Sequence, residues 1–367
     1  MPSQFVPILI MIVILTVLLA LYQQHWLKRL CLFLGADLRR RRSRVLLRMG
    51  GVLLTLCCLY LFAFPAVLLL HYFLFCALTD LAVWLWKKCF PRLRPKRFFR
   101  TVYRLSLVPL LITALVLGYG CYNMARYVRT DYRLDVNKPL SKSYRIIFLS
   151  DTHYGTVQSP ALLKAAVAEI NTLNADIIIL GGDIVEEQTA NSQMHEVFAC
   201  LGGLQSRYGV YCIFGNHDKQ SYSDAPAYSV QELTKAAAEN GITVLEDESR
   251  LINGELLLVG RADAGEKRLP LSRLLSDTPK EMTVLVADHQ PVGGEECDAA
   301  GADVLLSGHT HGGQFLPLNL ITELVGSPTY GNYTFGSCQL YVSSGFAGWG
   351  YPLRTAAHCE YLVLTLY

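Results

Sequence analysis

The stretch Asp303–Gln314, which reads DVLLSGHTHGGQ, decides how the second half of this chain is interpreted. An apolar run typical of a β-strand ends at Gly308, and His309 and His311 follow with one residue between them. Alternate side chains of a strand point to the same face, so the two imidazoles can leave the strand end side by side. Two imidazoles aimed at one point most commonly bind a metal ion. The stretch therefore predicts a pair of metal ligands at the end of a strand.

The composition changes abruptly near residue 130 of the 367. Residues 1–130 carry 18 Lys/Arg and 2 Asp/Glu, a net charge of +16, whereas residues 131–367 carry 15 Lys/Arg and 28 Asp/Glu, a net charge of −13. The basic side chains of the first part lie between long apolar runs, where membrane orientation explains them better than nucleic-acid binding does. We therefore expect a membrane-embedded first part, a mildly acidic globular second part and no nucleic-acid partner.

Four apolar segments of the first part are long enough to cross a bilayer as helices. Pro65 interrupts the apolar region 45–86, which we interpret as two helices joined by a short turn around Phe62–Pro65. The basic segments 28–44 and 87–104 are expected on the cytoplasmic side, which places everything after the last span outside the cytoplasm. The predicted anchor, residues 1–125, is a multi-pass segment of the plasma (inner) membrane with spans at about 5–22, 45–63, 66–86 and 105–122.

Two polar residues, His71 and Asp80, lie inside the third apolar segment. Ionisable residues within a membrane span can mark a proton or ion path. They can also bond to a neighbouring helix or lie near the interface, and two isolated residues favour this second interpretation. The first part is therefore interpreted as an anchor.

The second part begins with a polar juxtamembrane linker, 126–143. The domain that follows, residues 144–367, alternates strand-like with helical patterns. Such alternation is typical of an α/β domain with a central sheet, in which ligands bind beyond the carboxyl ends of the strands. Helices are predicted at Pro160–Leu173, which begins with proline, and at Tyr228–Asn240, which is followed by Gly241. Strands are predicted at Tyr144–Ser150, Ala175–Leu180, Val210–Phe214, Leu256–Val259, Met282–Ala287, Asp303–Ser307, Leu340–Ser343 and Tyr361–Leu366.

Polar motifs follow five of these strand-like runs directly. Five of the nine histidines fall in these short segments, a placement that chance does not readily produce. The motifs contain Asp151 and His153, then Asp183 and Glu186, then Asn216, His217 and Asp218, then His289 before Gln-Pro, and finally His309 and His311.

The residue types of these motifs indicate two metal ions rather than one. Carboxylate, imidazole and amide oxygen ligands suit Mn²⁺, Fe, Zn²⁺ or Ni²⁺ better than Ca²⁺ or thiophilic ions. Two Asp, one Asn and four His are too many for one ion, and they suit two ions that share a bridging carboxylate. A pair of ions can activate water at neutral pH and neutralise a phosphoryl group. His217 is then left as a proton donor to the departing oxygen, with Asp218 holding its imidazole in the right tautomer.

The five motifs, in this order, resemble those of the calcineurin-like metallophosphoesterase family over residues 144–366. The segment Gly345–Arg354 is similar to that of a membrane-associated bacterial subgroup. The resemblance implies two facing mixed β-sheets flanked by helices and a hydroxide that attacks phosphorus in line. Glu186 departs from the family pattern, in which Asp is common, at a position that is not normally a ligand. The resemblance also implies ligand roles: Asp151, His153 and His311 for the first ion, Asp183 as the bridge, Asn216, His289 and His309 for the second ion, and His217 with Asp218 for acid catalysis.

Each motif residue also has an ordinary structural interpretation. Asp or Asn after a strand commonly caps a turn or a helix, and His289 alone would be a hydrogen-bonded loop residue. Glu186 and Glu187 are expected to be solvated or to lie at a helix N-terminus. Arg354 could contact a substrate phosphate or pair with a carboxylate, and both options stay open. For Tyr330, Tyr333 and Trp349, a substrate groove and core packing are equally compatible with the sequence.

The predicted function is a membrane-anchored phosphoesterase that acts on phosphoester or pyrophosphate bonds with two divalent ions. The short linker suggests a second hypothesis, a lipid-linked substrate. The alternative is a non-catalytic module that uses the same fold for binding or sensing on a membrane bundle. The sequence does not define the metal, the choice between mono- and diesters, or the oligomeric state.

Overall fold

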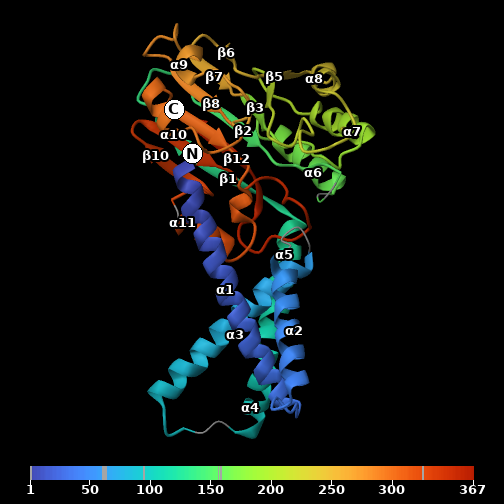
Figure 1. The fold of residues 1–367 in the computed structure, drawn as a ribbon. Helices are drawn as coiled ribbons and strands as arrows, with labels where there is room; N and C mark the ends of the chain where they lie inside the picture. Colours follow the sequence, from blue (N-terminus) through green and yellow to red (C-terminus); the bar gives the residue numbers. More distant parts are fainter. Residues whose placement is uncertain (1, 60–63, 94–95, 156, 158, 325) are drawn as a thin grey trace. The chain divides into compact units, whose positions relative to one another are not determined.

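The computed structural model describes residues 2–59, 64–93, 96–155, 157, 159–324 and 326–367. The chain divides into two compact units, Met1–Gly118 and Tyr119–Tyr367, and each is described by itself. Figure 1 shows the helices of the first unit and the sheets of the second.

The first unit is helical. Its helices are α1 (Pro2–Phe33), α2 (Arg41–Leu59), α3 (Phe64–Cys89), α4 (Arg97–Arg104) and most of α5 (Leu107–Met124). Among the described residues, α3 and α5 are long and apolar enough to cross a membrane. Of the four predicted spans, 66–86 and 105–122 therefore fall in such helices, whereas 5–22 and 45–63 do not meet this criterion among the described residues. The span 5–22 lies in α1, and residues 45–59 of the span 45–63 lie in α2, which carries four arginines; residues 60–63 lie outside the described residues. Of the predicted turn, Phe62 lies outside the described residues, and α3 already begins at Phe64.

The polar residues of α3 bond within the helical unit. Asp80 accepts a hydrogen bond from the Tyr22 hydroxyl at 2.8 Å and forms an ion pair with Arg29 on α1. His71 is buried, and its Nδ1 lies 2.8 Å from the carbonyl oxygen of Val67. Asp80 therefore joins α3 to α1, whereas the contact of His71 with Val67 lies within α3 itself.

The second unit is built on two six-stranded mixed sheets, as the resemblance implied. The first sheet has the order β1-β12-β2-β3-β4-β5, in which only the β12–β2 pair is antiparallel. The second has the order β10-β11-β9-β8-β7-β6, with antiparallel pairs at its two edges. The strands are β1 (Tyr127–Leu134), β2 (Tyr144–Leu149), β3 (Ile177–Gly181), β4 (Val210–Ile213), β5 (Ile242–Val244), β6 (Glu248–Ile252), β7 (Leu256–Gly260), β8 (Thr283–Ala287), β9 (Val304–Ser307), β10 (Gly331–Phe335), β11 (Cys338–Val342) and β12 (Cys359–Leu366).

Apolar side chains on both faces of each sheet produce a four-layer arrangement. One core fills the space between the sheets, with Phe148 of β2 and Leu306 of β9 among its members. A second core lies between the first sheet and α6 (Pro160–Asn171), α7 (Asn191–Leu201) and α8 (Val230–Glu239). A third lies between the second sheet and the short helices α9 (Leu271–Leu274) and α10 (Gly294–Ala300). Strands buried on both faces explain the continuous apolar runs in the sequence.

The predicted linker 126–143 is wrong for its first half, because residues 127–134 form β1. This strand pairs in parallel with β12 over its whole length. Its charged residues Arg129, Asp131 and Arg133 are exposed and alternate with half-buried residues. The only sequence signal of such a half-buried edge strand is the alternation of exposed and half-buried residues. The segment as a whole is polar, so this alternation is easily overlooked. Two residues therefore separate the end of α5 from the first strand of the second unit.

The five motifs lie beyond the carboxyl ends of five strands. Asp151 follows β2, Asp183 follows β3, Asn216 follows β4, His289 follows β8 and His309 follows β9. Within each sheet these strands run parallel to one another. Loops from both sheets consequently meet at one edge of the sandwich, where ligands bind in folds of this kind.

Candidate metal centre

Two triads of ligand side chains meet at this edge. The ligand atoms of Asp151, His153 and His311 all lie within 4.8 Å of one another, and all three residues are buried. The ligand atoms of Asp183, His289 and His309 satisfy the same condition. Each triad therefore has the spacing that one metal ion requires.

Asp183 belongs to the second triad and also faces the first. Its Oδ2 is 3.1 Å from His289 Nε2 and 3.8 Å from His153 Nε2. Its Oδ1 accepts a hydrogen bond of 3.0 Å from the backbone N–H of His217. One carboxylate oxygen thus faces an imidazole of each triad, which is the position that a bridging ligand would take.

The residues present fit a pair of divalent ions. The Asn216 side-chain oxygen is buried and has no hydrogen-bond partner, so the loop after β4 contains an unmet acceptor. His289 Nε2 and Asp183 Oδ2 face each other without the alignment of a hydrogen bond. Carboxylate, imidazole and amide donors form a set that suits Mn²⁺, Fe, Zn²⁺ or Ni²⁺. A cation between these atoms would satisfy all of them.

The backbone of the ligand loops is strained. A positive φ is uncommon outside glycine, and strained backbones cluster at functional sites. Two glycines also allow the loops to approach closely: a Cβ at Gly215 would lie 2.3 Å from Asp183 Oδ1, and one at Gly308 would lie 2.4 Å from Asp151 Oδ2. Five ligand residues have left-handed φ values: Asp151 (56°), His153 (40°), Asp183 (52°), His309 (71°) and His311 (51°).

Charge and burial divide the ligand histidines into two kinds. Burial lowers the pKa of His289, but the Asp183 carboxylate outweighs this effect and raises it to about 10. Burial likewise raises the pKa of Asp183, but the imidazoles around it, His289 foremost, bring it well below its usual value. Burial lowers the pKa of His309 and His311, which keeps both imidazoles neutral and able to bind a metal. At His289 a metal ion must therefore displace a proton.

His217 lies beside the triads and is oriented by Glu187. Its Nδ1 lies 2.7 Å from Glu187 Oε2, and its ring stacks on that of Trp349 with centroids 5.8 Å apart. Burial lowers the pKa of His217, but the hydrogen bond to Glu187 and the charge of Asp183 raise it above its usual value overall. Glu187 thus favours the protonated form of the imidazole and engages its Nδ1 rather than its Nε2.

The predicted pairing of Asp218 with His217 is wrong. Asp218 is fully buried, and its carboxylate accepts four backbone hydrogen bonds of 2.6–3.1 Å. Tight turns leave backbone N–H groups without partners, and a buried acceptor is needed to satisfy them. Asp218 therefore holds together the loop after β3 and the turn after β4. Its donors are the N–H groups of Asp183, Ile184, Val185 and Gly215.

The prediction that Glu186 and Glu187 are solvated is also wrong. Glu186 is buried, with Oε2 3.1 Å from His153 Nδ1, and Glu187 contacts His217. Their position in the same loop as the candidate ligand Asp183 was the sequence signal that could have indicated contacts with the site. In the structure the two adjacent carboxylates contact two different histidines, His153 and His217.

Arg354 adopts neither of its predicted roles. It is fully buried, and its guanidinium donates to the backbone carbonyls of Gly345, Ala347 and His358. Its Nη2 also lies 3.3 Å from His311 Nδ1. Arg354 thus fixes the loop after β11 against a candidate ligand.

The structure gives different environments to the three aromatic residues for which a substrate groove and core packing were both open. Trp349 stacks on His217 at the rim of the centre. The Tyr330 hydroxyl donates to Glu360, and the Tyr333 hydroxyl accepts from the backbone N–H of Thr329. Trp349 therefore lines the site, whereas the two tyrosines bond within the domain.

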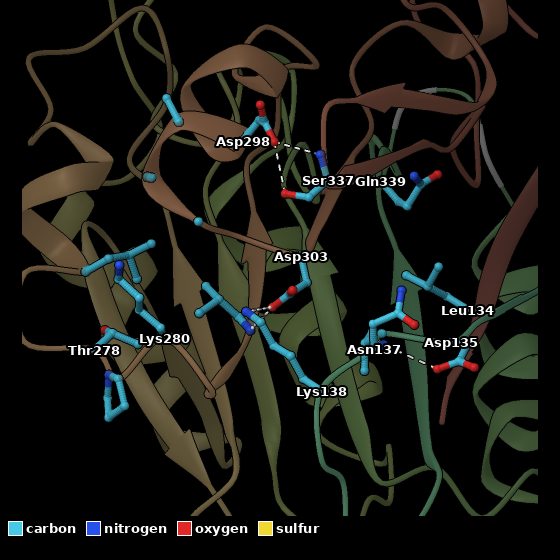
Figure 2. Close-up of a pocket in the computed structure, with 17 residues that line it drawn as sticks. Leu134, Asp135, Asn137, Lys138, Thr278, Lys280, Asp298, Asp303, Ser337 and Gln339 are labelled. Carbon is cyan, nitrogen blue, oxygen red and sulfur yellow. Dashed lines mark hydrogen bonds and ion pairs between the residues drawn. The ribbon is translucent and has the colours of Figure 1, made fainter.

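A cavity of about 590 Å³ lies at the opposite edge of the second sheet (Figure 2). It is lined by residues at the amino ends of strands, among them Val284 of β8 and Asp303, which precedes β9. Lys138 Nζ donates to Asp303 Oδ2 at 2.7 Å across this cavity (Figure 2). The cavity is therefore separate from the ligand loops.

Comparison with known proteins agrees with this geometry. The sequence model of the calcineurin-like phosphoesterase family matches residues 144–313. An uncharacterized metallophosphoesterase of Campylobacter jejuni is 27% identical over 274 residues, which cover 73% of this chain and 70% of the relative. The phosphodiesterase YaeI of Escherichia coli is 30% identical, over 64% of this chain and 86% of the relative. A transmembrane protein with metallophosphoesterase domain from Danio rerio is 28% identical over 70% of this chain, which spans 62% of that relative.

Proposed function

Because this chain belongs to the calcineurin-like phosphoesterase family, we propose that it is a membrane-anchored enzyme that hydrolyses phosphoester or pyrophosphate bonds with two divalent ions. The observation that carries the proposal is the position of Asp183, which belongs to one ligand triad and faces the other, with His217 beside them. A scaffold needs neither an unmet Asn216 oxygen nor a histidine with a raised pKa. The enzyme is therefore preferred to a binding or sensing module.

The seven ligand side chains would hold the ions in two groups. Bound there, two divalent ions would supply a water of lowered pKa and neutralise the charge of a phosphoryl group. Asp183 would be shared by both ions. The remaining ligands are Asp151, His153 and His311 for one ion, and Asn216, His289 and His309 for the other.

His217 is the proposed general acid. Its Nδ1 is occupied by Glu187, so Nε2 carries the proton that can be donated. As the bond between phosphorus and the departing oxygen breaks, its electron pair moves to that oxygen, which takes the proton from Nε2. Glu187 is a positioning residue, because it orients the imidazole and stabilises its charged form.

Membrane anchoring is supported by the apolar helices α3 and α5 and by the names of the Danio rerio and Bos taurus relatives. We extend it to a multi-pass anchor in the plasma (inner) membrane, with the catalytic domain outside the cytoplasm, on the basis of the basic segments 28–44 and 87–104. A reporter enzyme that works only outside the cytoplasm should be active when it is fused to the C-terminus, whereas a reporter that works only in the cytoplasm should be inactive there. The opposite result would reverse the proposed orientation.

A lipid-linked phosphoester is the proposed substrate class. Only two residues separate α5 from β1, so the domain cannot move far from the end of this apolar helix. The name of the Escherichia coli relative favours a diester over a monoester. Efficient hydrolysis of soluble esters together with indifference to phospholipid-like substrates would contradict this assignment.

Hydrolysis by the purified full chain tests the reaction itself. With Mn²⁺ the chain should hydrolyse an aryl phosphodiester, and His217→Ala should reduce kcat by about 10²–10⁴-fold without loss of bound metal. The loss should be larger for phenyl than for p-nitrophenyl esters, because the better leaving group needs less help from an acid. No hydrolysis by the wild type, no effect of His217→Ala and no bound metal would together favour the binding module.

A further inference from the structure

A short helix beside the metal centre exposes its leucines. Helix α11 (Leu318–Leu324) leaves Leu318 47%, Leu320 55% and Leu324 87% exposed. Single exposed leucines are ordinary, but Leu320 and Leu324 lie four residues apart and so share one exposed face of the helix, an apolar surface that indicates an interaction. We call Leu320 and Leu324 the α11 surface.

The α11 surface is fixed to the metal-binding turn. The 3₁₀ turn His311–Gly313 precedes it, and Gly313 packs so closely on Asn319 that a Cβ would lie 2.5 Å from Asn319 Cα. The backbone N–H of Leu316 donates to Thr355 Oγ1 at 3.0 Å. The helix is therefore held against the turn and the loop after β11.

The end of α5 is bonded to the same loop. The Asn123 side chain donates to the carbonyl oxygens of Arg354 (3.3 Å) and Ala357 (2.6 Å). The backbone N–H of Arg354 donates to the Gly120 carbonyl oxygen at 3.1 Å. Residues 353–357 thus join α11 on one side to the last turns of the apolar helix α5 on the other.

The last turns of α5 have the features of a membrane interface. Tyr119 and Tyr122 are exposed, and the Arg126 guanidinium lies 4.8 Å from the centre of the Tyr122 ring. Exposed aromatic side chains with a nearby cation are typical of the headgroup level of a bilayer. The α11 surface is therefore attached to the part of α5 at which the chain would leave the membrane.

We propose that the α11 surface docks into the headgroup and acyl boundary of the phospholipid bilayer that α5 crosses. The proposal rests on the membrane anchoring proposed above. A second copy of the chain or an apolar peptide would also cover leucines, but the bonded path from α11 to the end of α5 favours the bilayer. Because only four residues separate α11 from the turn that carries His311, docking would place the rim of the metal centre at the level of lipid headgroups.

The test uses the full chain in phosphatidylcholine and phosphatidylglycerol nanodiscs with an environment-sensitive fluorescent amino acid at Leu324. Brominated phospholipid should quench this probe strongly. Two matched leucines serve as controls: Leu111 in α5, which should be quenched as a membrane residue, and Leu251 on β6, which is 57% exposed and should not be quenched. All three probes replace exposed side chains, so the fold is not at risk.

The outcomes separate this proposal from the anchoring. Quenching at Leu324 and Leu111 but not at Leu251 supports docking. Quenching at Leu111 alone overturns the docking of α11 and leaves the anchor intact. No quenching at Leu111 overturns both, and quenching at all three positions overturns docking by a specific surface.

A photocrosslinking amino acid at Leu320 distinguishes lipid from protein as the occupant. On irradiation of the same nanodiscs, adducts between the chain and phospholipid are expected. A crosslinked dimer of the chain in place of lipid adducts would overturn the proposal.

Discussion

The two edges of the double sheet differ in how they treat charge. At the carboxyl edge, Asp151 and Asp183 are buried among imidazoles on strained backbones. At the amino edge, Asp303 and Lys138 line a cavity of about 590 Å³ and pair with each other while partly exposed to solvent. Chemistry is expected where ligands converge and water is excluded, because electrostatic interactions are stronger there. Convergence of unmet ligands, rather than the volume of a cavity, identifies the functional edge.

The largest expected effect is that of Asp183→Asn. Loss of the shared carboxylate should reduce activity by more than the roughly 10- to 100-fold typical of residues outside the ligand shell. The metal content should fall at the same time. Activity assays and elemental analysis of the purified full chain measure both quantities.

Asp303→Asn is the matched control at the amino edge. Asp303 contacts Lys138 and the backbone N–H of Val284, and it lies outside the ligand loops. Activity and metal content should therefore equal those of the wild type. An equal loss in both variants would mean that the two edges do not differ as described.

Asp218→Asn should act on stability. Its carboxylate accepts four backbone hydrogen bonds, and the amide would turn a donor toward N–H groups. The cost should be roughly 2–4 kcal/mol, which corresponds to a fall of about 5–10 °C in the Tm of the catalytic domain. An unchanged Tm would contradict the structural role assigned to Asp218.

The affinity for metal should depend on pH at the carboxyl edge. The pKa of His289 is raised to about 10, so its imidazole is protonated at neutral pH until an ion displaces the proton. The affinity for Mn²⁺ should fall by up to about tenfold for each unit by which the pH is lowered below that value. Titration calorimetry in buffers of different ionisation enthalpy measures the released proton, and an affinity independent of pH would contradict the assignment.

Glu187→Gln should move the pH profile. The acid form of His217 is required and is lost as the pH rises through its raised pKa. Without the Glu187 charge this pKa falls, so the decline of activity at high pH should shift to lower pH by roughly one unit. Glu186→Gln is the control: Glu186 contacts His153, so its loss should reduce metal content and leave the position of this decline unchanged.

The smallest effect is expected for Lys138→Met. The ion pair between Lys138 and Asp303 is partly exposed, so its loss should cost about 1 kcal/mol or less. Activity and metal content should be unchanged. A marked loss of activity would assign a role to the cavity at the amino edge.

The sequence predicted the fold class and all eight of the strands that it marked, because strands buried on both faces are continuous apolar runs. It also predicted that the five motifs with the seven candidate ligands lie at strand ends, since each motif follows such a run. Strand β1 was missed because its signal is an alternation of charged and half-buried residues. The three-residue strand β5 (Ile242–Val244) is too short to have a pattern.

The partners of neighbouring side chains could not be predicted. Asp218 follows His217 in the sequence, but backbone N–H groups bind its carboxylate, and Glu187 takes the place expected for it. Adjacent residues in a tight turn point in different directions, so spacing in the sequence does not determine their contacts. Arg354 is a similar case, because its guanidinium donates to three carbonyl groups of its own loop, whereas the sequence suggested a substrate phosphate or a carboxylate as its partner.

The central claim is that side chains from five loops bind two ions around one carboxylate. The most direct measurement is an anomalous difference map from crystals of the chain grown with Mn²⁺. Two peaks are expected, one among Asp151, His153 and His311 and the other among Asn216, His289 and His309, with Asp183 between them. A map without a peak at either triad, from crystals in which all seven side chains are ordered, would contradict the claim.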